Sequence, residues 1–175
     1  MPSPVGHALA GLTVHVLSAR GGAERRSLPR AALMVGAATA PDLDLLFRFI
    51  DGRNHHQAET HSIGAAALAA VLAWALTRAL RWPRPAALGS LAGCAWLTHV
   101  VLDYAGLDTH PPIGIMALWP FDSGFHKAPW PIFLDIGRTL EWATVRHDAL
   151  AVAWEIVLLG PLLLASWRLR ARAEA

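Results

Sequence analysis

Long apolar stretches alternate with short polar ones along the chain. The apolar segments lie at about residues 5–19, 31–50, 62–80, 86–106 and 149–167. Ala, Leu, Gly and Trp dominate them, with few β-branched runs and no sustained alternation of apolar and polar positions, which favours helices over strands. Thr60 or Ser62 is suited to cap the third segment, and Pro83 with Pro85 separates it from the fourth. We therefore predict an all-α fold of about five apolar helices, forming one domain over residues 1–175.

The composition favours insertion of these helices into a membrane. The chain is 54% hydrophobic and 16% charged, against averages of about 45–50% and about 25%. A spanning helix needs about 20 apolar residues, but the third segment has only 14 uncharged, mainly apolar residues, from Ile63 to Leu76. A soluble all-α enzyme with short buried helices therefore stays an alternative. The lone Cys94 rules out a disulfide framework within the chain, and residues 5–19 lack the basic start of a cleavable signal peptide.

Arginine placement predicts an orientation in the membrane. Ten of the fifteen basic residues lie in three regions between or after the apolar segments: Arg20, Arg25, Arg26, Arg30, Arg78, Arg81, Arg84, Arg168, Arg170 and Arg172. Five alternating spans put these regions on one face, which the positive-inside tendency makes cytoplasmic. Their clustering at segment ends argues against a nucleic-acid-binding stripe. We expect a multi-pass protein of the cell (inner) membrane, with a Pro- and Trp-rich extracytoplasmic loop at about residues 107–148.

Acids and histidines interrupt the apolar segments in three places. They are Asp42 and Asp44, His56 and His61, and His99 and Asp103. An ionised carboxylate in an apolar setting costs several kcal/mol unless something compensates it. Lys and Arg are scarce within these segments, so a bound metal cation is the simplest compensator. The predicted alternation brings all of these residues, together with His7, to the extracytoplasmic side.

The spacing of each pair limits what it can do. His99 and Asp103 share one helix face, so they can ligate one ion or simply hydrogen-bond to each other. Asp42 and Asp44 would be about 200° apart in a regular helix, so only one could face a site there. An extended turn would let both point one way. Otherwise one carboxylate caps a helix or pairs with Arg48.

For other polar residues the sequence gives weaker evidence of a functional role. His56 must come from the loop before the third segment, and Glu59 is a general base or a first-turn carboxylate favoured by the helix dipole. Glu155 supports the site or pairs with a helix residue. His55 is expected to be exposed and His15 to be structural. Candidates for a substrate entrance in the outer loop are Asp108, His110, Asp122 and His126.

Mixed His and carboxylate ligands suit Zn, Mn or Fe better than Ca or a thiolate-preferring metal. The ligands outnumber those that one tetrahedral ion needs, so a one-metal and a two-metal centre are both open. A nucleophile elbow, a P-loop and a dinucleotide-binding fingerprint are all absent from the sequence, which excludes those enzyme classes.

Taken together, the motifs resemble those of the YdjM-type membrane-bound metal-dependent hydrolases. They are Pro4-Val5-Gly6-His7, Pro41-Asp42-Leu43-Asp44, His56 with Thr60-His61-Ser62, His99 with Leu102-Asp103, and Trp119-Pro120-Phe121. The resemblance covers roughly residues 3–125 and implies functional roles for His7, Asp42, Asp44, His56, His61, His99 and Asp103. One departure is Gln57, where the family usually has Arg, and Arg53 is a candidate substitute. A fainter likeness to zinc-dependent phospholipase C, through its His-x-x-x-Asp ligand pair, suggests phosphodiester or lipid-headgroup hydrolysis by fold-level analogy.

We therefore expect a membrane hydrolase that acts on a phosphoester or lipid-linked substrate and uses one or two divalent ions, zinc foremost. The expected metal ligands are Asp42, His61, His99 and Asp103, while His7, Asp44 and His56 complete a second metal position or act as acid, base or supporting groups. The expected partners are the bilayer and a lipid substrate, not nucleic acid. The alternatives are a metal-binding or metal-transport protein, a haem protein, and a structural membrane protein whose polar residues pair internally.

Overall fold

A computed structural model describes residues 1–137 and 139–173 of the chain, and these residues contain helices and no strand. In chain order the elements are α1 (Pro4–Ser18), α2 (Gly22–Arg25), α3 (Leu28–Thr39), the 3-10 helix η1 (Ala40–Phe47), α4 (Arg48–Asp51), the 3-10 helix η2 (Glu59–His61), α5 (Ile63–Ala79), α6 (Pro85–Tyr104) and α7 (Trp142–Arg172). The all-α prediction is thus confirmed for the described residues.

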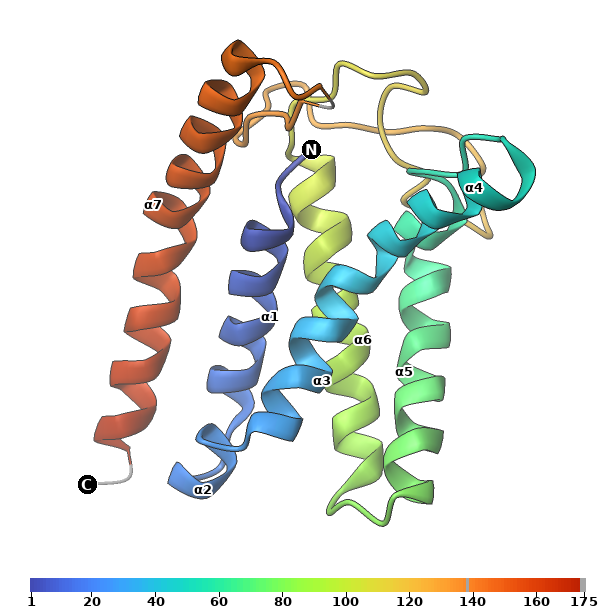
Figure 1. Ribbon diagram of the computed structural model, residues 1–175. Helices are drawn as coiled ribbons and strands as arrows, with labels where there is room; N and C mark the ends of the chain where they lie inside the picture. Colours follow the sequence, from blue (N-terminus) through green and yellow to red (C-terminus); the bar gives the residue numbers. More distant parts are fainter. Residues whose placement is uncertain (138, 174–175) are drawn as a thin grey trace.

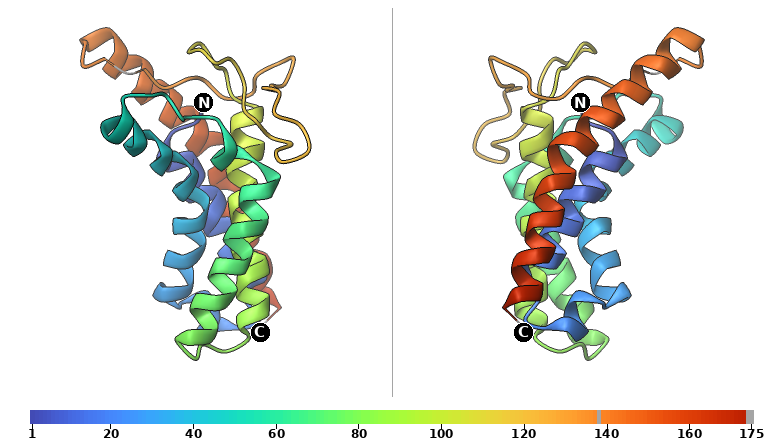
Figure 2. Two further views of the ribbon diagram at one scale, coloured as in Figure 1. Left: turned by 90° about the vertical axis from the view of Figure 1, so that its right-hand side faces the viewer. Right: turned by 90° about the vertical axis from the view of Figure 1, so that its left-hand side faces the viewer.

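The five longer helices, α1, α3, α5, α6 and α7, run side by side as a bundle (Figures 1 and 2). Helix α1 packs against α3, α6 and α7, while α5 pairs mainly with α6. The short helix α2, the α5–α6 turn and the end of α7 lie at one end of the bundle (Figure 1). The start of α1, helix α4 and the long segment before α7 lie at the other, which we call the upper end.

The apolar segment at residues 31–50 does not form one continuous α-helix. Helix α3 ends at Thr39, and the chain continues as the 3-10 helix η1. Pro41 explains the break, because it has no N–H to donate to the carbonyl four residues earlier and its ring crowds that carbonyl. Asp42 and Asp44 therefore lie in a 3-10 helix, which has fewer residues per turn than the α-helix α3.

Fewer helices are long enough to span a membrane than the sequence predicts. Among the described residues, α6 and α7 are sufficiently long and apolar, with mean hydropathies of 1.4 and 2.0, instead of about five such helices. Helices α1, α3 and α5 have 15, 12 and 17 residues. At 1.5 Å per residue each is shorter than the roughly 30 Å hydrocarbon layer. These three helices are therefore too short to count as candidate membrane spans, unlike α6 and α7.

The outer loop is shorter than predicted, since α7 begins at Trp142. The segment from residue 105 to 137 folds back on the bundle and accepts hydrogen bonds from the free N–H groups at the start of α5. Ile63 donates to the carbonyl of Ala117, and Gly64 donates to that of Trp119 (2.9 and 3.0 Å). A Cβ at Gly64 would lie 2.7 Å from the Trp119 ring. The Trp119-Pro120-Phe121 motif thus helps to hold the N-terminal end of α5 in place, and His61 lies just before that end.

Close packing of α5 and α6 depends on Gly89, and this gives a first prediction. A Cβ at Gly89 would lie 2.6 Å from the Ala70 carbonyl oxygen and 2.7 Å from the Trp74 Cβ. Gly89→Leu is therefore expected to lower the free energy of unfolding by about 3 kcal/mol, as severe overpacking does. Unfolding in detergent, followed by circular dichroism, measures this change.

The matched control for that prediction is Gly36→Leu in α3. A Cβ at Gly36 meets nothing within 4 Å. Because leucine favours a helix more than glycine does, this control should be as stable as the natural protein or slightly more so. Equal destabilisation by the two substitutions would show that the α5–α6 contact is not the cause.

Candidate metal centre

Separate elements carry the predicted site residues to the upper end of the bundle. The second turn of α1 carries His7, η1 carries Asp42 and Asp44, the loop before η2 carries His56, η2 ends at His61, and α6 carries His99 and Asp103 one turn apart. Because a 3-10 helix turns by about 120° per residue, Asp42 and Asp44 point in different directions. They approach His61 at its two different ring nitrogens.

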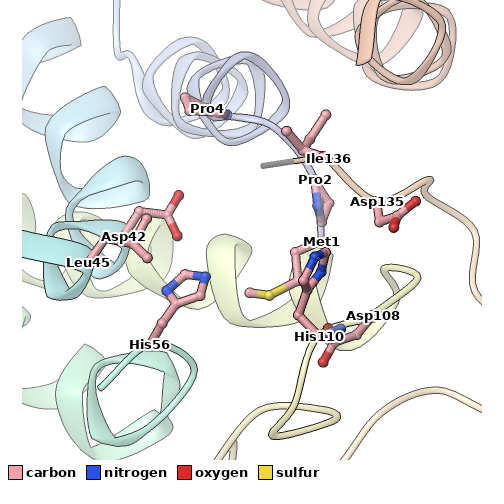
Figure 3. Close-up of a pocket in the computed structure, with 11 residues that line it drawn as sticks. Met1, Pro2, Pro4, Asp42, Leu45, His56, Asp108, His110, Asp135 and Ile136 are labelled. Carbon is pink, nitrogen blue, oxygen red and sulfur yellow. The ribbon is translucent and has the colours of Figure 1, made fainter. Parts of the chain in front are cut away.

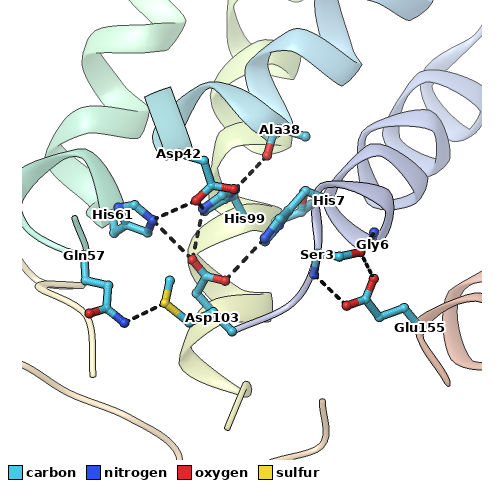
Figure 4. Close-up of polar contacts among 12 residues, drawn as sticks. Ser3, Gly6, His7, Ala38, Asp42, Gln57, His61, His99, Asp103 and Glu155 are labelled. Carbon is cyan, nitrogen blue, oxygen red and sulfur yellow. Dashed lines mark hydrogen bonds and ion pairs between the residues drawn. The ribbon is translucent and has the colours of Figure 1, made fainter. Parts of the chain in front are cut away.

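A four-residue cluster of Asp42, His61, His99 and Asp103 forms the centre of this site (Figure 4). His99 Nε2 lies 3.0 Å from Asp103 Oδ2 and 3.5 Å from Asp42 Oδ1. His61 Nε2 lies 3.3 and 3.5 Å from the same two oxygens. The side chains of His61, His99 and Asp103 are 0% exposed, and that of Asp42 is 24% exposed. Two imidazoles and two carboxylates therefore converge on one largely buried point.

The second nitrogen of each imidazole determines its tautomer. His99 Nδ1 donates to the Ala38 carbonyl (2.8 Å). His61 Nδ1 faces the Thr60 hydroxyl oxygen at 3.0 Å and an Asp44 oxygen at 3.2 Å. A neutral imidazole with its hydrogen on Nδ1 has a lone pair on Nε2. Both Nε2 lone pairs then face carboxylate oxygens, and neither Nε2 has a hydrogen-bond partner.

Acceptors that face one another in a buried place need a positive charge between them. Burial lowers the pKa of His61, but the carboxylates of Asp103, Asp42 and Asp44 outweigh it and raise that pKa well above the ordinary value. The carboxylates therefore favour a positive charge at this position, carried either by the protonated His61 ring or by a metal ion. Ligands about 2.0–2.1 Å from a tetrahedral zinc ion would be about 3.3 Å apart, close to the observed separations of 3.0–3.5 Å. These side chains can hold a metal ion.

His7 lies directly beside the cluster. Its ring stacks on that of His99, with 3.7 Å between the centroids, and its Nε2 lies 3.3 Å from Asp103 Oδ1. Neither ring nitrogen of His7 has a hydrogen-bond partner. His7 thus contacts the carboxylate oxygen that the four-residue cluster leaves unused.

Asp44 belongs to a network behind His61. One oxygen of Asp44 accepts from His56 Nδ1 (2.8 Å), and the other accepts from the Thr60 hydroxyl (2.6 Å). Burial raises the pKa of Asp44, but the hydrogen bonds from His56, His61 and Thr60 more than offset this effect, so that pKa is below its ordinary range. Asp44, His56 and His61 are also close enough together to form a second metal-binding group. In the structure, however, they are joined by hydrogen bonds.

The position of Asp44 gives a second prediction. A carboxylate that accepts a hydrogen bond from a metal-bound imidazole fixes the ring and raises its basicity, and its loss typically costs 10–100-fold in affinity. Asp44→Asn should weaken metal binding by about that factor, as measured by competition with a fluorescent chelator. Asp51→Asn is the control, because Asp51 holds the exposed His55 in a similar bond (2.6 Å). Unchanged affinity in the Asp44 variant would contradict this role.

A cavity of about 290 Å³ opens beside the cluster (Figure 3). Asp42 and His56 form one side of it, and Asp108, His110 and Asp135 line other parts. Since Asp42 belongs to the four-residue cluster, the cavity gives a small molecule access to that cluster. Two of the proposed entrance residues, Asp108 and His110, are thus next to the site.

Other candidate residues lie elsewhere. Asp122 and His126 bond to each other (2.7 Å) on the surface. His55 binds Asp51 as an exposed pair, and buried His15 bonds to the Arg25 carbonyl (2.9 Å), which agrees with the expected roles of these two histidines.

Gln57, at the departure from the family pattern, is buried and donates to Asp108 (2.9 Å). It therefore supports the cavity wall. Arg53 is exposed and does not line the cavity. Glu59 is exposed at the start of η2.

Glu155 of α7 holds the start of α1 in place. It accepts from the backbone N–H of Ser3 (2.6 Å) and from the Ser3 hydroxyl. Ser3 in turn accepts from the N–H groups of Val5 and Gly6. A Cβ at Gly6 would lie 2.8 Å from Glu155 Oε2. Glu155 is therefore part of a helix cap one turn before His7, not a member of the cluster.

Sequence reasoning missed three contributors to this region. The Ala38 carbonyl orients His99, the Thr60 hydroxyl bonds to Asp44, and Asp135 lines the cavity. A backbone carbonyl has no sequence signal. Thr60 does have one, since it immediately precedes His61 in the Thr60-His61-Ser62 motif, but the role considered for its side chain was a helix cap and not a bond to Asp44.

Comparison with known proteins identifies the family of the chain. A family described as YdjM inner membrane protein matches residues 1–173 of the chain. Searches of curated proteins and of solved structures each give no match. The family match covers all elements that contribute to the cluster.

Proposed function

Since the chain belongs to the YdjM inner membrane protein family, we propose that it is a multi-pass membrane hydrolase with a divalent metal centre. Asp42, His61, His99 and Asp103 hold the ion, and zinc suits this donor set best, with manganese and iron as the other candidates. The single observation that carries the proposal is the convergence of His61 Nε2 and His99 Nε2, neither of which has a hydrogen-bond partner, on two carboxylates in a buried place.

The apolar surface supports a membrane location. Helix α7 is largely exposed, and Leu150, Val157, Leu162 and Leu169 are each more than half exposed. Soluble monomers rarely present apolar surface on this scale. We place the cluster end of the bundle on the extracytoplasmic side, because the arginine-rich segments lie at the opposite end (Figure 1).

The chain's own groups supply proton transfer and access to substrate. A bound divalent ion supplies Lewis acidity and lowers the pKa of water towards neutrality. His56 donates a hydrogen bond through Nδ1 to Asp44, so its Nε2 is an acceptor at the wall of the cavity. That nitrogen takes a proton from the attacking water, and Asp44 stabilises the imidazolium that results. Asp42, the most exposed member of the cluster, faces the same cavity.

The proposed substrate is a phosphoester, foremost one in a lipid or a lipid-linked molecule. The cavity lies at the end of the bundle where a bilayer headgroup would be found, which supports this choice. With a volume of about 290 Å³, it is at the small end of ligand pockets. It therefore suits a headgroup rather than a whole lipid.

A test compares metal-loaded protein with chelator-treated protein in detergent. The assay uses bis(p-nitrophenyl) phosphate and phospholipid micelles, and we expect hydrolysis only from the metal-loaded sample. Metal-dependent flux into proteoliposomes without hydrolysis of any probe would instead favour the transport alternative. The gathering of the ligands at one end of the bundle, rather than along its length, supports hydrolysis over transport.

A further inference from the structure

Two histidines line the cavity beside the metal centre. His56 lies with Asp42 on one side of it, and His110 lies with Asp108 on another (Figure 3). In the proposed hydrolysis His56 acts as the base, and His110 has no assigned role. His110 is half-buried and comes from the segment between α6 and α7, outside the four-residue cluster. Its imidazole is therefore a candidate for a second proton transfer in the same cavity.

Hydrogen bonds determine the tautomer of His110. The Thr109 hydroxyl donates to Asp135 Oδ2 (2.7 Å), because an ionised carboxylate only accepts. That bond uses the hydroxyl hydrogen, so the imidazole is the donor in the 3.2 Å contact between His110 Nδ1 and the Thr109 oxygen. The lone pair of the neutral ring is then on Nε2, and a second proton binds there.

His56 has the same tautomer but different surroundings. It donates through Nδ1 to Asp44 (2.8 Å), which also lies 3.2 Å from His61 of the cluster. The carboxylate behind His110 instead bonds to exposed His147 on α7 (3.0 Å). In both arrangements the carboxylate stabilises an imidazolium. His56 is therefore connected to the metal centre, whereas His110 is connected to the surface.

Asp108 fixes the backbone from which His110 projects. Its Oδ1 accepts from the His110 N–H (3.1 Å), and its Oδ2 accepts from the Gly114 N–H (2.7 Å) and from the Gln57 amide (2.9 Å). A group that transfers protons has to be held close to its working geometry. Gln57, at the departure from the family pattern, thus helps to position His110.

Hydrolysis of an alkyl phosphoester needs two proton transfers. Water loses a proton as its oxygen bonds to phosphorus, and the leaving oxygen gains one as its own bond to phosphorus breaks, since a free alkoxide is a strong base. The attacking and leaving oxygens lie roughly in line through phosphorus. A base beside the attacking water is therefore on the wrong side to protonate the leaving oxygen.

We propose that His110 is the general acid of this hydrolysis, positioned by Thr109 and Asp135. Protonated His110 gives its Nε2 hydrogen to the leaving oxygen, which departs as an alcohol, while His56 takes the proton lost by the water. His56 then releases a proton to solvent and His110 takes one up, so the net reaction consumes one water. This role rests on the proposed function and narrows its substrate to esters whose leaving group is an alcohol, as in a phospholipid.

The dependence of the rate on the leaving group tests this role. Bis(p-nitrophenyl) phosphate releases a stable anion that needs no proton, whereas a short-chain phosphatidylethanolamine in micelles releases an alcohol. His110→Gln should lower kcat for the phospholipid by about 10²–10⁴-fold, and that for the nitrophenyl ester far less. Thr109→Val should cause a smaller loss with the same preference. The metal content of both variants should equal that of the natural protein, since neither residue belongs to the cluster.

Two matched controls come from outside the cavity. His126 bonds to Asp122 and Thr139 bonds to Thr144, each at 2.7 Å, and none of these residues lines the cavity. His126→Gln and Thr139→Val should therefore hydrolyse both esters at the natural rate.

Nitrogen NMR of protein with isotope-labelled histidine tests the geometry without any substrate. The signal of His110 is identified by its loss in His110→Gln. At alkaline pH, where the imidazole is neutral, we expect its hydrogen on Nδ1, and Thr109→Val should remove that preference. A hydrogen on Nε2 in the natural protein would overturn the proposed positioning.

The kinetic outcomes separate this role from the proposed function. Equal losses on the two esters in His110→Gln, or an undiminished rate on the phospholipid, would rule out the general acid. Cleavage of the nitrophenyl ester alone by the natural protein would also overturn it, because no alkyl leaving group would then be protonated. Cleavage of neither ester by the metal-loaded natural protein would instead be a failure of the proposed hydrolysis itself.

Discussion

Alanine at both position 99 and position 103 is expected to remove the bound metal and, with it, all metal-dependent hydrolysis. His99 and Asp103 contribute two of the four converging donor atoms. Losing a supporting group alone costs 10–100-fold in metal affinity, so losing two ligands should cost well over about 100-fold. Elemental mass spectrometry of protein purified in detergent without chelators measures the outcome. The natural protein should carry one or two equivalents of Zn, Mn or Fe, and the double variant almost none.

The chain contains its own control for this experiment. Asp122 and His126 are also four residues apart and also form a carboxylate–imidazole pair, but on the surface. The Asp122→Ala, His126→Ala variant should keep its full metal content. A natural protein without metal after gentle purification would favour internal pairing of the buried acids and histidines. Full retention of metal by the His99, Asp103 variant would place the ion elsewhere.

Replacing His56 by glutamine should leave the metal content nearly unchanged but lower kcat by about 10²–10⁴-fold, the usual contribution of a general base. His56 bonds to Asp44 and reaches the cavity wall, but it is not part of the four-residue cluster. Its proposed task is proton transfer, so the loss should affect turnover. The measurement pairs metal analysis with the rate of bis(p-nitrophenyl) phosphate hydrolysis by the metal-loaded protein.

His55→Gln is the neighbouring control, since His55 binds Asp51 away from the cavity. It should retain normal turnover. Unchanged turnover in the His56 variant would rule out the proton-transfer role. A large loss of metal in the same variant would instead indicate that His56 is a ligand and that Asp44, His56 and His61 form a second metal position.

The sequence was most informative where chemistry and spacing coincide. His99 and Asp103 share a helix face because they are four residues apart, and the structure places them 3.0 Å from each other. The all-helical class and the family resemblance also followed from the residues alone. In each instance the deciding feature is local or is a motif in fixed order, and such features can be recognised without coordinates.

The sequence was less informative about geometry that depends on distant parts of the chain. The sequence left open whether Asp42 and Asp44 lie in a regular helix or an extended turn, whereas the chain forms a 3-10 helix from Ala40 to Phe47. Because of this 3-10 helix, Asp42 lies near Nε2 of His61 and Asp44 lies near its Nδ1. The Ala38 carbonyl beside His99 has no sequence signature at all. Helix length likewise depends on where turns form, so α1, α3 and α5 are shorter than a spanning helix.

The bond between Ser3 and Glu155 affects how far the chain can be shortened. Helix α7 could be regarded as a detachable membrane anchor, since it is the longer of the two candidate spans and contributes no member of the cluster. Yet Glu155 closes the cap that holds the start of α1, one turn before His7. A version of the protein truncated before Trp142 would lose the Glu155 carboxylate that holds Ser3, the capping residue of α1, as well as its anchor. A water-soluble fragment that keeps an intact site is therefore not obtained by removing the last helix.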